Sequence, residues 1–174
     1  MSTGPLVICY DGSPDAVEAI GYAGRLLPGA PAIVVTVWKP IVEELLASAA
    51  EAPPISDPVE ANERQRRAAT DLAREGARRA AAAGLRAEPR VVMAEGSLWE
   101  TVEEVAQEHG AGLIACGTSR SGLKSALPGN LAGALVQRSS HAVLVVPSPK
   151  AAAERREAFE KEHRKAAFTT SSRR

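Results

Sequence analysis

The stretch PLVICYDGSP, residues 5–14, sets the pattern that decides the fold. Its apolar first half has the length of a buried strand, and an Asp-Gly pair ends that strand. Ser13 is a good N-cap, and Pro14 suits the first turn of a helix, where its missing N–H costs nothing. Apolar residues then recur at helical spacing up to Pro28. The stretch therefore predicts a buried strand followed directly by a helix.

The same alternation continues along the chain. Residues 32–38 form a second apolar run rich in β-branched residues, which favours a strand of a parallel sheet covered on both faces. Residues 39–58 are less regular, with one or two helical turns expected over 41–52. Three further strands are predicted, over residues 86–93, 112–116 and 142–146. Helices are predicted over residues 14–27, 59–83, 97–110 and 130–138. This order predicts an α/β fold with an open parallel five-stranded sheet.

The charges divide the chain into two unlike parts. The 174 residues carry 21 Lys and Arg against 21 Asp and Glu, so the net charge is zero. Residues 1–148 hold 13 basic and 17 acidic side chains, whereas residues 149–174 hold 8 basic and 4 acidic ones. We therefore expect one domain over 1–148 and a charged, Ala-rich tail that is helical over 150–167 and disordered from Thr169. The tail is expected to be loosely held. Docking on the acidic body is the alternative, and contact of the tail with DNA or a membrane is a minor one.

The composition excludes several classes of protein. Two cysteines make neither a disulfide framework nor a four-ligand zinc site. No apolar run approaches the roughly 18 residues of a membrane span, and no signal peptide is visible. Six arginines between residues 64 and 79 alternate with acids, and the chain has six aromatic residues, so a nucleic-acid site is not expected. These features predict a cytoplasmic protein that binds neither nucleic acid nor membrane.

The sequence offers no evident catalytic group. His109, His141 and His163 are far apart in the sequence and have no evident orienting partner. A Ser-His-Asp arrangement therefore cannot be built from them. No other nucleophile has an assigned base, so no catalytic residue is predicted.

Two loops carry the residues that suit a binding site. In a parallel α/β sheet, ligands bind outside the carboxyl ends of the strands, where the winding reverses. Asp11 follows the first strand, where it can accept hydrogen bonds from a ligand or cap the helix. The Gly/Ser-rich residues 117–129 follow the fourth strand, with Arg120 and Lys124 as donors for an anion. They are not a P-loop, because Leu123 stands where a lysine is required.

Five pieces of the sequence, taken together, resemble the universal stress protein family over about residues 5–147. They are VICYDGS, AEGS, LIACGT, RSGLKSALPGN and HAVLVVP, in this order. The resemblance implies a parallel sheet in the order 3-2-1-4-5 with two helices on each face. It also implies a cytoplasmic, dimeric protein of the stress response. In one branch of this family, ATP lies between the loops after strands one and four.

The resemblance also implies a set of nucleotide-binding residues. Asp11 matches the acid that contacts the ribose or adenine, and Val37 matches the apolar residue beside the adenine. Gly117 and Gly129 match the first and last glycines of the motif G-x2-G-x9-G-(S/T), with Asn130 in the Ser/Thr position. The predicted ligand is ATP or AMP, with Mg²⁺ as a companion ion. The whole predicted set is Cys9, Tyr10, Asp11, Val37, Cys116, Gly117, Thr118, Arg120, Gly129, Asn130, Leu131 and Ala132.

The sequence departs from this motif at one point that matters. Gly117 and Gly129 are 12 positions apart where the motif needs 13, and the missing residue is the second glycine. Two functions therefore stay open. The first is a stress-response regulator that binds an adenine nucleotide. The second is a dimeric interaction or scaffold module that has lost the phosphate cradle. A hydrolase or transferase is the third possibility, but it lacks a visible catalytic group, so slow ATP hydrolysis is the most that is expected.

Two further features concern neighbouring strands. Family members pair the fifth strand across a two-fold axis, so the resemblance implies an interface formed by Val143, Leu144, Val145 and Val146. The alternative is an edge covered by the tail helix. Cys9 and Cys116 are expected side by side as small buried residues, with a redox pair as the less favoured interpretation.

Overall fold

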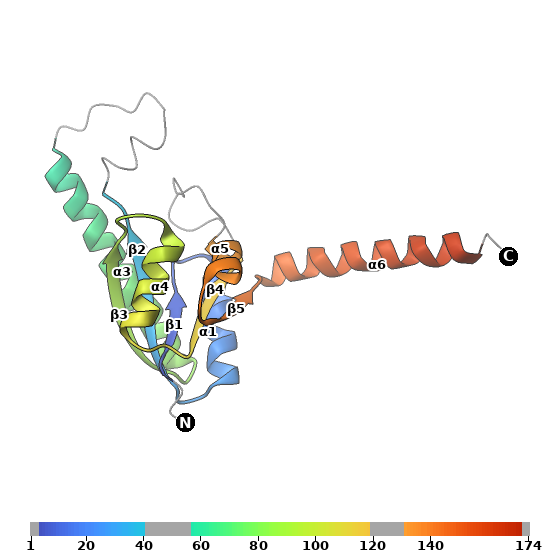
Figure 1. The fold of residues 1–174 in the computed structure, drawn as a ribbon, viewed down its shortest axis with the longest axis horizontal. Helices are drawn as coiled ribbons and strands as arrows, with labels where there is room; N and C mark the ends of the chain where they lie inside the picture. The colour runs from blue at the N-terminus through green and yellow to red at the C-terminus, as the bar shows by residue number, and fades with distance from the viewer. Residues whose placement is uncertain (1–3, 41–56, 119–130, 172–174) are drawn as a thin grey trace.

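The computed structural model describes residues 4–40, 57–118 and 131–171, and within them strands alternate with helices (Figure 1). The strands are β1 (Leu6–Cys9), β2 (Pro31–Trp38), β3 (Arg86–Met93), β4 (Leu113–Gly117) and β5 (Ala142–Val146). The helices are α1 (Pro14–Leu26), α3 (Pro58–Ala82), α4 (Leu98–Glu108), α5 (Leu131–Arg138) and α6 (Pro149–Ser171). The helical turns expected over residues 41–52 lie outside the described residues.

All five strands form one parallel sheet in the order β3-β2-β1-β4-β5. The predicted order 3-2-1-4-5 is confirmed. β1 lies between β2 and β4, so the winding of the chain reverses between β1 and β4. This reversal places the candidate site at the carboxyl ends of these two strands.

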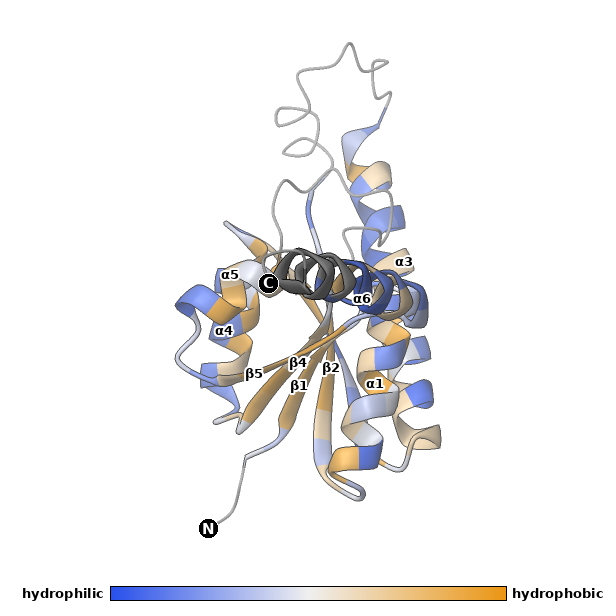
Figure 2. Cartoon of the chain, turned by 90° about the vertical axis from the view of Figure 1, so that its right-hand side faces the viewer, coloured by the Kyte–Doolittle hydropathy of each residue, from blue (hydrophilic) through white to orange (hydrophobic). Residues whose placement is uncertain are grey.

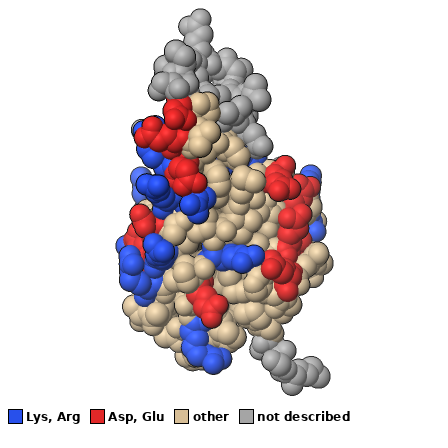
Figure 3. All heavy atoms as spheres, turned by 90° about the vertical axis from the view of Figure 1, so that its left-hand side faces the viewer, with Lys and Arg blue, Asp and Glu red and all other residues tan. Residues whose placement is uncertain are grey.

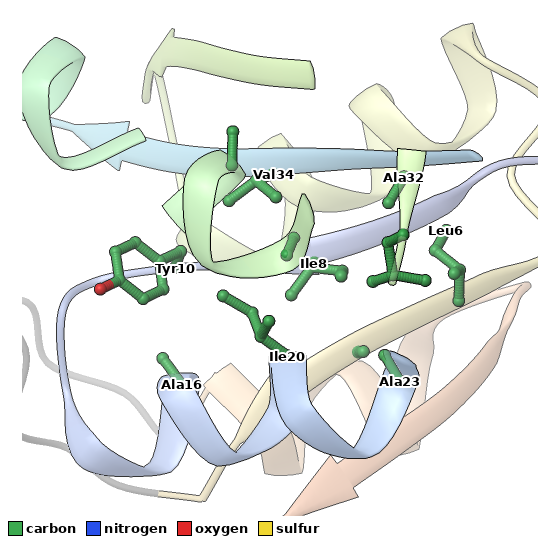
Figure 4. Close-up of a cluster of buried hydrophobic side chains, with 12 residues drawn as sticks. Leu6, Ile8, Tyr10, Ala16, Ile20, Ala23, Ala32 and Val34 are labelled. Carbon is green, nitrogen blue, oxygen red and sulfur yellow. The ribbon is translucent and has the colours of Figure 1, made fainter. Parts of the chain in front are cut away.

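Two apolar clusters hold the helices against the sheet. On the face covered by α1 and α3, Ile8, Val34 and Ile20 point toward one another from β1, β2 and α1 (Figure 4). On the face covered by α4 and α5, Val7 and Ile114 pack with residues of both helices. Figure 2 shows the apolar strands between these two helix layers. The predicted arrangement, with two helices on each face, is confirmed.

Small residues allow α3 to lie close to the sheet. Its buried side is formed by Ala61, Ala69, Ala73, Gly76, Ala77 and Ala80. A Cβ atom on Gly76 would lie 2.6 Å from Cδ1 of Tyr10 and 2.8 Å from Cγ1 of Val34. Only glycine therefore fits here, and the ring of Tyr10 fills the space between β1 and α3.

Polar side chains fix the starts of three helices. The Ser13 hydroxyl accepts the Ala16 N–H at 3.2 Å, so the predicted N-cap of α1 is confirmed. Ser97 and Glu100 form the predicted capping box of α4. Asp57 caps α3 by accepting two backbone N–H groups, a role the sequence analysis did not assign. Each such cap contributes about 1 kcal/mol to helix stability.

The tail helix α6 leads away from the domain. Figure 1 shows it projecting from the end of β5, and its side chains from Ala153 to Lys161 are exposed. In the described residues it neither docks on the domain nor covers the outer edge of β5, so these two alternatives are not observed. The helix reaches Ser171, beyond the expected end at Ala167, and it includes Thr169, where disorder was expected.

The arginines of α3 pair with acids on the same helix. Arg66 lies 3.1 Å from Glu63, and Arg79 lies 2.7 Å from Glu75. Figure 3 shows blue and red side chains interleaved over this side of the molecule. This face therefore has the mixed charge of a solvated helix rather than a continuous basic patch. Among the described residues, no helix is both long enough and apolar enough to span a bilayer.

Candidate functional site

The carboxyl ends of β1 and β4 lie side by side. The two strands pair in parallel from Leu6 with Leu113 to Ile8 with Ala115. The loops that begin at Asp11 and Thr118 therefore start at the same edge of the sheet. This is the place where sheets of this type bind ligands.

Asp11 organises the first loop with one of its two carboxylate oxygens. Oδ1 accepts the backbone N–H of Ser13 at 3.0 Å, and Gly12 between them has a φ of 78°, a left-handed conformation that favours glycine. The other oxygen, Oδ2, accepts no hydrogen bond from any residue that the structure describes. Because Ser13 caps α1, Asp11 is not needed as the cap. Within the described part of the chain, one oxygen of this half-buried carboxylate thus remains for a ligand.

Asp15 is a site residue that the sequence analysis missed. Its carboxylate Oδ2 accepts the hydroxyl hydrogen of Thr118 at 2.6 Å, and the residue is only 4% exposed. Thr118 also donates its backbone N–H to the carbonyl of Val146 at 3.2 Å. The first residue of the loop after β4 is therefore held by both α1 and β5. An acid in the first turn of a helix was the only local signal for this contact.

Gly117 brings the end of β4 against the start of α1. A Cβ atom on Gly117 would lie 2.5 Å from Cβ of Asp15 and 2.8 Å from the backbone N of Ala16. A larger residue would push α1 away from the sheet. Gly117 thus has a packing role of its own, beside the phosphate-binding role that the family motif implies.

The predicted apolar residues gather on one face of the sheet. Cys116 is 1% exposed, and Cys9 and Val37 are partly buried beside it in the cluster under α4 and α5. Leu131 and Ala132, at the start of α5, pack against the same cluster. Five predicted site residues therefore line one apolar region beneath the candidate site.

Tyr10 points to the opposite face. Its ring is buried among the residues of α1 and α3, and its hydroxyl donates to Oε1 of Glu75 at 3.2 Å (Figure 4). Its carbonyl accepts the Thr36 hydroxyl at 2.8 Å. The structure thus places this side chain apart from the rest of the predicted set. The alternation of side chains along an extended chain, with Cys9 at the end of β1 on one face and the next residue, Tyr10, on the other, was the signal for this.

Part of the predicted set cannot be placed. Arg120, Gly129 and Asn130 lie outside the described residues, as does Lys124. Their roles toward a phosphate stay predictions from the family motif.

The two thiols beneath the site are held in their protonated form. Burial raises the pKa of Cys116 to about 11. Burial also raises the pKa of Cys9 well above its usual range, and Cys116 and Asp11 raise it further. Since the thiolate is the reactive form of cysteine, both residues are poor nucleophiles at neutral pH. This favours the interpretation as small buried residues over a redox pair.

A second polar cluster joins α4 to the turn between α5 and β5. Glu103, which is 7% exposed, accepts the hydroxyl hydrogens of Ser139 and Ser140, both at 2.6 Å, and the Ser140 N–H at 3.0 Å. Nδ1 of His141 lies 3.0 Å from Oε1 of Glu103. The sequence interpretation that His141 has no orienting partner is therefore wrong. Glu103 was hidden in the sequence because it is one of several acids on α4.

This cluster is not a nucleophile with its base. Both serine hydroxyls donate to Glu103, and Ser140 Oγ lies 3.4 Å from Nδ1 of His141, the same nitrogen that faces Glu103. Burial acts to raise the pKa of Glu103, but the hydrogen bonds from Ser139, Ser140 and His141 lower it to about 2. The cluster is therefore an ionised acid surrounded by donors, which ties three elements together.

Comparisons with known proteins place the chain in a family. The model of the universal stress protein family matches residues 3–147. A universal stress protein solved in complex with cAMP is 25% identical, with a TM-score of 0.59 over 85% of this chain and 99% of that chain. A protein of the universal stress protein family from Burkholderia pseudomallei is 23% identical, with a TM-score of 0.58 over 83% of this chain and 96% of that one.

A more distant structure has the same fold. The universal stress protein from Archaeoglobus fulgidus in complex with dAMP is 18% identical, with a TM-score of 0.54 over 84% of this chain and 99% of that chain. No curated protein matches the sequence. Because the family model covers most of the chain, this protein belongs to the universal stress protein family.

Proposed function

We propose that this protein is a cytoplasmic stress-response regulator that binds an adenine nucleotide between the loops after β1 and β4. The observation that carries the proposal is the position of Asp11, whose second carboxylate oxygen is free among the described residues at the point where the winding reverses. Two of the structural neighbours were solved with cAMP and dAMP, both adenine nucleotides. This supports an adenine nucleotide as the ligand class.

The residues around Asp11 suit the parts of such a ligand. A carboxylate accepts hydrogen bonds from a ribose hydroxyl or from the adenine amino group. Val37 and Cys9 offer apolar surface beside it, since both are partly buried in the cluster under α4 and α5. The family motif assigns the phosphate to Gly117, Gly129 and Asn130. The chain thus has a residue for each part of a nucleotide, although its motif lacks one glycine.

Calorimetric titration tests this function. Wild-type protein is titrated with ATP, ADP and AMP, with and without Mg²⁺. Asp11→Ala is expected to weaken binding by roughly 1–3 kcal/mol, the cost of losing a good polar contact. Asp71→Asn is the matched control, because the Asp71 side chain is 80% exposed on α3. Absence of binding by all three nucleotides would remove the proposal and leave the interaction or scaffold module.

The proposal includes a homodimer formed through β5. Val143, Leu144 and Val145 are only partly buried, and β5 is an edge of the sheet. On the flank of β5 that is formed by α5, the side chain of Val136 is 63% exposed. An open apolar edge of this kind invites pairing with a second copy.

The opposite flank of β5 adds apolar surface of the same kind. Tyr22 and Leu26 of α1 are 46% and 59% exposed. Their spacing from Asp15 puts them on the same side of the helix as that residue. Because Asp15 contacts Thr118 beside β5, this side of α1 faces β5. Light scattering at micromolar concentration tests the dimer, and a monomer mass would exclude it.

A further inference from the structure

The tail helix α6 leaves the domain on the side where the sheet has its open edge. β5 ends at Val146, and α6 begins at Pro149. The Ser148 hydroxyl accepts the backbone N–H of Ala151 at 3.3 Å, and the Ser148 carbonyl accepts that of Ala152 at 2.8 Å. The first turn of α6 is therefore capped directly after the edge strand. From there the helix runs outward, away from β4 (Figure 1).

A second copy that pairs through β5 occupies the space into which α6 runs. A two-fold axis perpendicular to the sheet makes the two paired edge strands antiparallel. The carboxyl end of β5 in one copy then lies beside the amino end of β5 in the other. Because α6 follows this carboxyl end, it starts beside the amino edge of the second copy, the edge of the sheet at which the strands begin.

α6 is long enough to cross this amino edge. Its 23 residues give a helix about 34 Å long. The outer strands of the five-stranded sheet are about 19 Å apart, because neighbouring strands are about 4.8 Å apart. Phe159 lies about 15 Å along the helix from Pro149, which is within the width of that sheet.

The tail and the amino edge both carry exposed apolar side chains. Phe159 of α6 is 60% exposed, and its ring contacts that of His163 on the same helix. α1 returns from the carboxyl ends of the strands to the amino edge, so Tyr22 and Leu26 in its last turns lie at this edge. Both are exposed on the side of α1 that faces β5. An apolar anchor on α6 therefore has an apolar counterpart on a second copy.

The charges of the two parts are complementary. Residues 1–148 hold 13 basic and 17 acidic side chains, a net charge of −4, whereas residues 149–174 hold 8 and 4, a net charge of +4. Opposite net charges attract the tail to a body of this kind. The direction of α6 leads its exposed Arg155 and Arg156 away from their own body. The body that these side chains can reach is that of a second copy.

We propose that α6 docks on the second copy of the dimer, with Phe159 against Tyr22 and Leu26 at the amino edge of that copy. The proposal rests on the dimer that the proposed function includes, and it adds the tail as a second part of the interface. Because the axis is two-fold, each copy gives one α6 and receives one. The matched family model ends at residue 147, so this contact lies outside the part of the chain that the family model covers.

Photo-cross-linking of the full-length protein tests the contact directly. A benzophenone amino acid replaces Phe159, and unlabelled chains are mixed with isotope-labelled chains before irradiation. We expect cross-links that join a labelled chain to an unlabelled one and that attach to the last turns of α1, which hold Tyr22 and Leu26. Absence of such cross-links in a sample that light scattering shows to be dimeric overturns the proposal. Cross-links within one chain also overturn it, because α6 then docks on its own body.

The dimer dissociation constant, measured by analytical ultracentrifugation, tests the energetics. Phe159→Ala should raise it about tenfold, since one phenylalanine side chain from each copy is lost from the interface. Wild-type protein should also dimerise more weakly as salt rises to about 0.5 M, because salt screens the attraction between tail and body. Arg155→Glu together with Arg156→Glu should remove most of this salt dependence. Val59→Ala is the matched control, because Val59 is 73% exposed on α3, which packs on β2 and β3.

The outcomes separate this proposal from the proposed function. If wild-type protein is a monomer, the proposed dimer fails and the docking of α6 fails with it. If wild-type protein dimerises and Phe159→Ala has the same dissociation constant, only the docking fails. Calorimetric titration with nucleotides is independent of both results, so it judges the proposed ligand by itself.

Discussion

Glu103 gives the sharpest test of how this fold is held together. The change is Glu103→Gln, which keeps the shape of the side chain and removes its charge. In the folded protein, burial raises the pKa of Glu103, but the donors of Ser139, Ser140 and His141 outweigh burial and lower it from 4.5 to about 2. A difference of about 2.5 in pKa corresponds to about 3 kcal/mol of folding free energy.

The sign of the pH dependence follows from this direction. Because the folded-state pKa of Glu103 is lowered, its ionised form stabilises the folded state at pH values above about 4.5. That stabilisation is lost as the pH falls from about 4.5 to about 2, as the carboxylate takes up a proton. We therefore expect Glu103→Gln to lower the free energy of unfolding by about 3 kcal/mol at pH 7 and by much less near pH 2.

Urea unfolding, followed by circular dichroism between pH 2 and pH 7, measures this difference. Glu104→Gln is the matched control, because Glu104 is the next residue of α4 and is exposed. It should change the unfolding free energy by less than about 0.5 kcal/mol. A destabilisation by Glu103→Gln that stayed constant across this pH range would refute the reasoning, because it would come from packing rather than from the ionised carboxylate.

Two other predictions concern buried residues of α3 and β4. Gly76→Ala should lower the free energy of unfolding in urea by about 1–3 kcal/mol, because the added Cβ would lie 2.6 Å from the ring of Tyr10. An unchanged unfolding midpoint would contradict this close approach. Cys116, with its pKa raised to about 11 by burial, should react with iodoacetamide at pH 7 far more slowly in the native protein than in urea. Equal labelling rates in the two states would show that its thiol is accessible and reactive.

The strands and the caps of α1 and α4 were predictable because local patterns determine them. Apolar runs flanked by turn residues define the strands. Ser13 and the Ser97–Glu100 pair act on backbone groups within three residues of themselves. The alternation of strands with helices then favours a parallel sheet. The order 3-2-1-4-5 came from the family resemblance, and the structure confirms it.

The polar contacts of Asp15 at the site and of Glu103 in the second polar cluster were not predictable, because their partners are distant in the sequence. Asp15 and Thr118 are 103 positions apart, and Glu103 and His141 are 38 positions apart. A single sequence offers no means of pairing such residues. Each acid also has an ordinary local interpretation, Asp15 as a first-turn acid and Glu103 as one of several acids on α4.

The buried carboxylates of Asp15 and Glu103 both help to hold β5 in place. β5 is an edge strand, and only Val146 among its residues is fully buried. At its amino end, the Glu103 cluster holds His141, the residue before the strand. At its carboxyl end, Val146 accepts the N–H of Thr118, whose hydroxyl donates to Asp15. Polar contacts therefore fix both ends of a strand that has little packing of its own. Thr118 belongs to the candidate nucleotide loop and also holds the end of β5, so one residue connects the proposed ligand site with the strand of the proposed dimer surface.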